Sequence, residues 1–493
     1  MISISSDWWI SFQWWNTVSN LFLLLNTVLA FFILFFERKK PSSLWAWILL
    51  LFFLPVIGFV LYLLFGQPHN KKKGKQPAPY ENREIQKLSD DQLKEIDHGS
   101  FDFISAATEE FQDIIRMNLR SETAPLTHNN RLRIYTDGKR KFDSLFIDIK
   151  AAKDHIHLQY YIIKNDDIGN RLIELLTEKA QQGVKVLVLY DDIGSKSLPG
   201  NFFSGFFRAG GKAAALLPSR LPFGNPHINY RNHRKIAIID GEIGYIGGFN
   251  VGDEYLGKKP EFGYWRDTHL RVEGDGVHSL QNRFLLDWNK TSRKHPVQYA
   301  STYFPSANIK KGAAMQTVSS GPDDTFDQIK NGFLKMIHHA RNAIYIQTPY
   351  FIPDNAVLEA IRTAALSGVD VQIMIPNKSD HPFVHAASLS FIHELLIAGV
   401  KVYRYNNGFL HAKTVTVDGK AFSAGSANMD LRSFSLNYEA NAFVYDQESA
   451  EEMARIFLND VELSNELTLK SFENRSLFER GKQRVARLVA PIL

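Results

Sequence analysis

One pattern of polar residues around an apolar strand occurs twice in this chain. Residues 232–250 read NHRKIAIIDGEIGYIGGFN and residues 410–428 read LHAKTVTVDGKAFSAGSAN. Both stretches contain His-x-Lys-x4-Asp-x6-Gly-(Gly/Ser)-x-Asn with the same internal spacing. A single His-x-Lys pair is common on a solvated surface strand, whereas two matched copies predict a duplicated functional motif. The matched residues are His233, Lys235, Asp240, Gly247, Gly248 and Asn250 in the first copy, and His411, Lys413, Asp418, Gly425, Ser426 and Asn428 in the second.

The segments around the two motifs repeat in the same order. A predicted strand at 152–163 or 340–351 leads into an amphipathic helix, and a Gly-Val turn then opens a second strand at 181–192 or 366–377. Strands that alternate with helices in this way indicate a layered α/β fold. We therefore predict two α/β lobes, residues 126–300 and 301–470, each of which carries one motif.

The period of a strand assigns the motif residues to faces. Residues two apart on an extended chain project to the same side, so His233 and Lys235 point together. Asp240 lies seven residues after His233 and would point to the opposite face of a continuous strand. We therefore expect Asp240, and Asp418 in the second copy, to tie down nearby loops rather than to contact a substrate.

Two long apolar stretches precede the lobes. Residues 8–36 and 44–65 contain no charged side chain, and each is about as long as the ~20 residues that a membrane-spanning helix needs. A cleaved signal peptide does not fit, because no basic region precedes the first stretch and a second stretch follows it. We predict a two-helix transmembrane hairpin within residues 1–66, with a pair of soluble core helices as the alternative.

Basic residues flank the second predicted span on both sides. The loop between the spans holds Arg38, Lys39 and Lys40, and the downstream flank holds Lys71, Lys72, Lys73 and Lys75. The larger downstream cluster favours a cytoplasmic location for both ends of the hairpin, and hence for the lobes of a cell-membrane protein. Residues 67–125 are polar and are predicted as a linker with some helix.

Composition excludes several classes of site. The chain has no cysteine, which rules out disulfides, thiolate metal sites and a cysteine nucleophile. Its net charge of +5 gives no indication of a nucleic acid partner. In the last segment, residues 471–493, basic and apolar side chains interleave. This pattern predicts a basic amphipathic tail at a membrane surface, and a solvated terminal helix is an equal alternative.

On its two motifs the chain resembles the phospholipase D superfamily, and within it the bacterial cardiolipin synthases. The resemblance covers about residues 128–450, and the sequences NYRNHRK (229–235) and QTPYF (347–351) belong to it. It implies that the two lobes are related by pseudo-twofold symmetry and unite their motifs in one site. It also implies that one phosphatidylglycerol is joined to another through a phosphohistidine, giving cardiolipin and glycerol. No cofactor and no metal ion are implied.

The resemblance implies a role for each motif residue. His233 is expected as the nucleophile and His411 as the general acid and base, although a symmetric pair of motifs does not itself decide between them. The lysines would stabilise charge on the phosphoryl oxygens, and the glycines would let backbone approach the phosphate. The implied catalytic residues are His233, Lys235, Asp240, His411, Lys413 and Asp418, with Asn250 and Asn428 as neutral phosphate donors.

Each histidine also needs a carboxylate at its far ring nitrogen. The second half offers Glu439 in NYEANAFVYD (437–446), and the matching segment YWRDTHLRVEG (264–274) offers Asp267. Both could instead be ordinary carboxylates at strand ends. Arg231 and Arg234 are further candidates for phosphate contacts.

Three other functions remain open from the sequence. A membrane-bound phospholipase D would hydrolyse phospholipids to phosphatidic acid in the same pocket. A tethered nuclease would need a basic groove with stacking aromatics, and no concentrated basic stretch lies near either motif, so we expect no nucleic acid partner. A non-catalytic membrane scaffold is the third. The expected partners are phosphatidylglycerol and anionic membrane lipids, and the oligomeric state is not determined.

Overall fold

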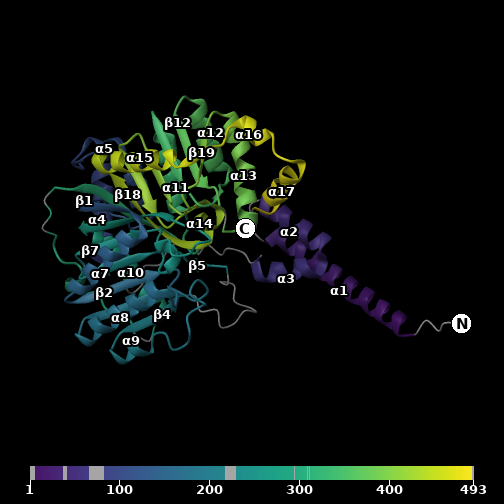
Figure 1. Cartoon of the computed structure of the whole chain (residues 1–493), viewed down its shortest axis with the longest axis horizontal. Coiled ribbons are helices and arrows are strands. Elements are labelled where there is room, and N and C mark those ends of the chain that lie inside the picture. Colours follow the sequence, from purple (N-terminus) through teal and green to yellow (C-terminus); the bar gives the residue numbers. More distant parts are fainter. Residues whose placement is uncertain are drawn as a thin grey trace.

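Strands and helices alternate in the same order in both halves of the chain (Figure 1). The computed structural model describes residues 6–36, 41–65, 83–216, 229–293, 295–307, 309, 311–378 and 380–490. The first lobe comprises β1 (Thr127–Asp137), α7 (Gly138–Ala151), β2 (His155–Tyr160), α8 (Asp167–Gln181), β3 (Lys185–Asp191), α9 (Ser204–Arg208), β4 (Lys212–Leu216), β5 (Arg231–Asn232), β6 (Ile236–Ile239), β7 (Ile243–Gly247), the 3-10 helix η1 (Asp253–Leu256), β8 (Trp265–Gly274) and α10 (Gly276–Thr291).

The second lobe repeats this plan after the short 3-10 helix η2 (Ser301–Tyr303). It comprises β9 (Ala313–Ser320), α11 (Gln328–His339), β10 (Ala343–Gln347), β11 (Phe351–Ile352), α12 (Asn355–Leu366), β12 (Asp370–Pro376), α13 (Pro382–Ile397), β13 (Lys401–Tyr405), β14 (Phe409–Leu410), β15 (Thr414–Val417), β16 (Ala421–Gly425), β17 (Met429–Asp430), α14 (Leu431–Ser435), β18 (Asn437–Tyr445), α15 (Gln447–Glu462) and β19 (Ser464–Glu466).

Each lobe contains a mixed sheet of matching topology. The first sheet has the order β4-β3-β2-β6-β7-β8-β1, and the second has the order β13-β12-β10-β15-β16-β18-β9. β1 pairs with β9 and joins the two sheets. The predicted α/β fold with two equivalent lobes is therefore confirmed.

The two lobes also share a hydrophobic core. In the first lobe, α10 contributes the buried side chains of Val277, Leu280 and Phe284. These belong to one cluster with Ala440 and Ala442 of β18 in the second lobe. Because apolar surface buried between lobes stabilises their association, the lobes form one folding unit rather than two tethered domains.

Short strands exchange between the lobes immediately before each motif. β5, which precedes His233, pairs in parallel with β18 of the second lobe. β14, which precedes His411, pairs in parallel with β8 of the first lobe. Each motif histidine therefore follows a short strand that is paired with the opposite lobe.

The motif aspartates lie at the turns that follow the motif strands. Asp240 has a φ of 53° and Asp418 a φ of 54°, both in the left-handed region. The carboxylate of Asp240 accepts hydrogen bonds from the backbone N–H groups of Lys153, Asp154 and His155 at 2.7–2.9 Å. Asp418 accepts from the N–H groups of Arg341, Asn342 and Ala343, each at 2.8 Å. Both aspartates thus hold the loop that enters the first parallel strand of their lobe, as the strand parity predicts.

The N-terminal helices project from the lobes, and the long first helix extends beyond the other two (Figure 1). They are α1 (Ser6–Phe36), α2 (Pro41–Phe53) and α3 (Pro55–Phe65). The stretch 44–65, predicted as one span, is divided at Leu54, because Pro55 lacks an N–H group and cannot continue the helix. Among the described residues, no helix combines the length and apolarity needed to cross a membrane. The predicted basic flanks, Arg38–Lys40 and Lys71–Lys75, lie outside the described residues.

Helices α4 (Arg83–Asp97), α5 (Ala106–Glu110) and α6 (Gln112–Ser121) occupy the described part of the predicted linker. α6 buries Ile114, Ile115 and Leu119 in the core of the second lobe. The segment is predicted to be a polar linker with some helix, and α6 in addition packs one apolar face against this lobe. At the other end of the chain, α16 (Leu469–Glu473) and α17 (Leu477–Val489) form the tail.

Replacement of Asp240 by alanine is expected to lower the free energy of unfolding by about 2 kcal/mol. Three backbone N–H groups would lose their acceptor, and a residue without a polar side chain would have to hold a positive φ. The urea midpoint of the detergent-solubilised protein measures this loss. Asp240→Asn keeps one acceptor oxygen and tolerates the left-handed conformation, so it should lose less. An unchanged midpoint for the alanine variant would contradict this structural role.

Candidate active site

The two motif histidines are held by backbone as well as by side-chain contacts to the opposite lobe. The N–H group of His233 donates to the carbonyl of Tyr438 in β18 at 2.9 Å. The N–H group of His411 donates to the carbonyl of Arg266 in β8 at 2.7 Å. These bonds continue the exchanged pairs β5–β18 and β14–β8, so the pseudo-twofold arrangement extends to the histidines themselves.

Glu439 of the second lobe orients His233 of the first lobe. Nδ1 of His233 lies 3.0 Å from the Glu439 carboxylate and also 3.0 Å from the carbonyl oxygen of Ser426. The same carboxylate is fully buried and accepts from the Ser426 hydroxyl at 2.5 Å and from the Asn437 amide at 3.1 Å. Three donors therefore fix the carboxylate that fixes the imidazole.

Asp267 of the first lobe orients His411 of the second lobe. Nδ1 of His411 lies 2.5 Å from one oxygen of the fully buried Asp267 carboxylate, and the Thr268 N–H donates to the other at 2.7 Å. The two carboxylates predicted from sequence are thus brought to the histidines, but each crosses to the other lobe. The sequence pattern identified both carboxylates without indicating this exchange, which depends on pairing between distant strands.

Both imidazoles keep their second nitrogen available. Among the described residues, none forms a hydrogen bond to Nε2 of His233 or His411, and the two side chains are 12% and 9% exposed. A carboxylate on Nδ1 selects the tautomer with a lone pair on Nε2 when the ring is neutral. Each ring can therefore attack an electrophile or exchange a proton at Nε2.

The motif lysines are buried, and each contacts the backbone of the histidine of its own motif. The ammonium of Lys235 donates to the carbonyl of His233 at 2.6 Å, and the ammonium of Lys413 donates to the carbonyl of His411. Burial lowers the pKa of Lys235 well below its usual value and that of Lys413 to about 8. The carboxylates of both lobes, Glu439 and Asp267, act in the opposite direction on each lysine. This mutual influence shows that the two motifs form one electrostatic site.

Burial favours the neutral form of both histidines. Burial lowers the pKa of His233, although Glu439 acts to raise it. Burial, followed by the charge of Lys413, lowers the pKa of His411 to about 4. Burial alone would raise the pKa of Glu439, yet His233 and Lys235 hold it below its usual value, so the carboxylate stays ionised. An anion that entered between the lysines would favour the protonated form of a histidine.

The motif asparagines and glycines have protein neighbours. The amide of Asn250 donates to the Tyr255 hydroxyl at 2.8 Å, and that of Asn428 donates to Asp430 at 3.0 Å. A Cβ atom on Gly247 would come within 2.5 Å of the His269 backbone, and one on Gly248 within 2.0 Å of the Asp267 carboxylate. These two glycines therefore make room for β8 and for Asp267.

Two buried ion pairs, which the sequence did not predict, lie next to the site. Arg234 is buried and pairs with Asp287 at 2.7 Å, so it supports the fold rather than a substrate. On the other side of the site, Arg266 of β8 pairs with Asp460 at 2.8 Å, although the residue equivalent to Arg234 is Ala412. Two matched glutamines join these pairs. Gln159 of β2 donates to Asp287, and Gln347 of β10 donates to Asp460, each at 2.8 Å. The matched Gln in HLQYY and YIQTP was a visible signal for this pair of networks.

Aromatic rings lie against both histidines. The ring of Tyr161 lies edge-on to that of His233 with a centroid distance of 5.0 Å, and Trp265 lies 5.3 Å from His411. Within the described part of the chain, no group of three or more His, Cys, Asp or Glu side chains could hold a metal ion. The site thus consists of two histidines, two lysines, two carboxylates and their aromatic surroundings.

The chain is similar over nearly its whole length to known proteins. It is 50% identical over 477 residues to the major cardiolipin synthase ClsA of Bacillus subtilis (strain 168), which covers 96% of this chain and 98% of that protein. It is 49% identical over 470 residues to a cardiolipin synthase of Staphylococcus aureus (strain N315), which covers 95% of each chain. The family model "Cardiolipin synthase, PLD-like domain" matches residues 145–288 and 333–461.

The chain belongs to the cardiolipin synthases of the phospholipase D superfamily. The predicted family, and with it the enzyme class of phosphatidyltransferases, are confirmed. A second family model, described as phospholipase D-nuclease N-terminal, matches residues 24–67. The crystal structure of phosphatidylserine synthase from Haemophilus influenzae Rd KW20 has the same fold, with a TM-score of 0.59 and 14% identity over 79% of this chain and 100% of that one.

A Gly248→Ala substitution is expected to reduce the synthase activity of this family member by at least about tenfold. The new Cβ atom would displace the Asp267 carboxylate and release His411 from its orientation. Turnover of phosphatidylglycerol in detergent micelles measures the effect. Ser426, the equivalent residue of the second copy, already carries a Cβ atom, so Ser426→Ala should retain more activity. Full activity of Gly248→Ala would contradict the inferred role of Asp267.

Proposed function

We propose that this chain transfers the phosphatidyl group of one phosphatidylglycerol to a second phosphatidylglycerol, which yields cardiolipin and glycerol. The observation that carries this proposal is the pair of histidines from different lobes, each oriented at Nδ1 by a buried carboxylate of the opposite lobe. The two buried lysines of the same site supply positive charge for one phosphodiester. The family of the chain supports a phosphatidyl transfer.

In the first half-reaction, Nε2 of neutral His233 attacks the phosphorus of the first lipid. The bond between phosphorus and the glycerol headgroup oxygen breaks. His411, which the bound phosphate anion favours in its protonated form, gives its proton to that oxygen, so that glycerol leaves. The phosphatidyl group is then bonded to His233. Glu439 stabilises the cationic ring that forms, and Lys235 and Lys413 stabilise the phosphoryl oxygens.

In the second half-reaction, His411 acts as a base. It removes the proton from a headgroup hydroxyl of the second phosphatidylglycerol, and the oxygen attacks phosphorus while the bond to His233 breaks. Cardiolipin is released, His233 is neutral again and His411 is protonated again. If water took the place of the second lipid, the product would be phosphatidic acid, which is the alternative phospholipase D activity.

Incubation of the purified chain with phosphatidylglycerol is expected to give cardiolipin and glycerol in equal amounts. His233→Ala and His411→Ala should each lower this activity by about 10³-fold or more, because each removes one chemical step. Quantification of lipids by mass spectrometry measures the products. Phosphatidic acid as the main product would favour the hydrolase, and unchanged turnover in both variants would exclude the proposed chemistry.

A lipid with a p-nitrophenyl headgroup separates the roles of the two histidines. Its leaving group needs no proton, so His411→Ala should still form the phosphatidyl-enzyme and release p-nitrophenolate in a burst. His233→Ala should give no burst, since it lacks the nucleophile. The opposite result would assign the nucleophile to His411.

We also propose that α1–α3 form the predicted two-pass hairpin and hold the site at the membrane, with the lobes on the cytoplasmic side. Support comes from large apolar side chains that remain exposed along the hairpin, among them Leu24, Phe31, Phe35, Phe52 and Phe53. The amide nitrogen of Asn26 donates to the carbonyls of Leu51 and Pro55 at 3.2 and 2.8 Å, so both of these carbonyls have a donor inside the hairpin. Lipid would cover the exposed apolar surface.

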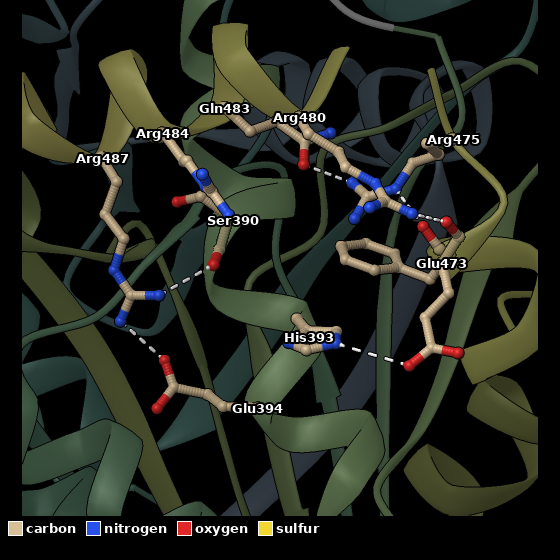
Figure 2. Close-up of a pocket in the computed structure, with 10 residues that line it drawn as sticks. Ser390, His393, Glu394, Glu473, Arg475, Arg480, Gln483, Arg484 and Arg487 are labelled. Carbon is tan, nitrogen blue, oxygen red and sulfur yellow. Dashed lines mark hydrogen bonds and ion pairs between the residues drawn. The ribbon is translucent and has the colours of Figure 1, made fainter. Parts of the chain in front are cut away.

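The tail supplies a second proposed contact with anionic lipid. Leu477 and Phe478 of α17 are 84% and 82% exposed, and Leu488 is exposed as well. On the side of α17 that faces α13, a pocket gathers Arg475, Arg480, Arg484 and Arg487 (Figure 2). Arg487 is held by Ser390 and Glu394 of α13, whereas no hydrogen bond or ion pair engages Arg484 within the described residues. Exposed apolar side chains beside arginines suit an anionic membrane surface.

A cysteine at position 478 is expected to report this contact, since the chain has no other cysteine. An environment-sensitive dye on Phe478→Cys should shift to shorter wavelength when the full chain is reconstituted in phosphatidylglycerol, compared with phosphatidylcholine. Arg480→Gln together with Arg484→Gln should reduce this shift. A dye on Glu174→Cys, an exposed position of α8 in the first lobe, serves as the control. Equal emission from position 478 in both lipids would contradict the proposal.

A further inference from the structure

The proposed reaction brings two phosphodiesters into one cleft, and this inference rests on that function. The reacting phosphate would be held by Lys235 and Lys413, both buried at the centre of the site. The phosphate of the acceptor lipid does not react, yet it carries a negative charge beside the first. A site that joins two such lipids needs a second group of cations at its margin, because like charges in a cleft repel.

Arg231 and Arg432 lie at the margin next to His233. Arg231 belongs to β5, two residues before His233, and its strand pairs with β18 at Asn437. Arg432 belongs to α14 of the second lobe, and its guanidinium donates to the carbonyl of Asn229, two residues before Arg231, at 3.1 Å. The exchanged strand thus brings two arginines of different lobes together, and both side chains are half-buried.

Tyr161 connects this pair of arginines to the catalytic centre. Its ring lies 5.0 Å from that of His233, and the ammonium of Lys235 lies 5.3 Å from the same ring. Burial raises the pKa of the Tyr161 phenol, and the charges of Arg231 and Arg432 act to lower it. The charges of both guanidinium groups therefore act on a side chain that contacts His233.

The arginines repel each other within this margin. Burial lowers the pKa of Arg231; Asp191 acts to raise it and Arg432 to lower it further. The Asp191 carboxylate is itself shared among the backbone N–H groups of Ile193, Gly194 and Asn232, at 2.8–3.0 Å. A bound anion would relieve the repulsion, since guanidinium groups bind phosphate oxygens in a bidentate manner.

The pseudo-symmetric margin next to His411 has the opposite character. The residue equivalent to Arg231 is Phe409, which packs among Trp265 and Phe262. The residue equivalent to Arg432 is Glu254, a buried carboxylate paired with Lys164. An aromatic side chain and a carboxylate do not bind phosphate. The two motifs are nearly symmetric, but at these two pairs of equivalent positions arginines occur only next to His233.

We propose that Arg231 and Arg432 bind the phosphodiester of the acceptor lipid and so select a phospholipid over water or a small alcohol. The two arginines take no part in the reaction at the donor phosphate, which the motif histidines and lysines carry out. It makes the site specific for an acceptor that carries its own anionic group.

Cardiolipin synthesis and glycerol exchange, measured on the same enzyme, distinguish binding of the acceptor phosphate from binding of the donor phosphate. Cardiolipin synthesis needs the acceptor phosphate, whereas exchange of radiolabelled glycerol into phosphatidylglycerol needs only the donor lipid and a neutral alcohol. Arg231→Gln and Arg432→Gln should each lower cardiolipin synthesis by about tenfold or more and leave glycerol exchange within about twofold of wild type. Arg432→Lys should recover part of the lost synthesis. Retained exchange also shows that the variants fold.

Arg208→Gln, at an exposed arginine of α9, controls for the change in net charge and should alter neither activity. Equal losses of synthesis and exchange would overturn the assignment, because the arginines would then serve the donor phosphate or the fold. Unchanged synthesis would overturn it as well. A wild-type chain that makes phosphatidic acid and no cardiolipin would overturn the proposed function and this inference with it.

Discussion

The crossed pairing of histidine and carboxylate is the interaction on which the site depends. Glu439 of the second lobe holds His233 of the first, and Asp267 of the first holds His411 of the second. Buried carboxylates are costly unless they are paired, so each lobe would leave an unpaired charge if it folded without the other. The shared core around α10 and the strand exchanges β5–β18 and β14–β8 keep both pairs intact.

The two half-sites are equivalent in topology and different in detail. Ser426 donates a hydroxyl to Glu439, whereas the equivalent Gly248 leaves its space to the Asp267 carboxylate. A phosphoryl transfer through one histidine needs the other as an acid, and two identical environments would give both rings the same proton affinity. Small differences of this kind let a duplicated motif perform two tasks.

Much of this arrangement follows from the sequence because it is local. Motif spacing and strand parity place the histidines with the lysines and direct Asp240 and Asp418 to the loops. The exchange of Asp267 and Glu439 between lobes could not be predicted, because it depends on pairing between strands far apart in the chain. The filled space at Gly247 and Gly248, the burial of α6 and the break before Pro55 likewise depend on neighbours that a linear pattern does not contain.

Specificity must arise where the two halves of the chain differ. The duplicated residues can perform phosphoryl chemistry on any phosphodiester, because they contact only the groups common to all of them. The helices α1–α3 and α17 have no counterpart in the repeat, and the arginines at positions 231 and 432 are matched by Phe409 and Glu254. The asymmetric margin is therefore the place where an acceptor lipid can be distinguished from water.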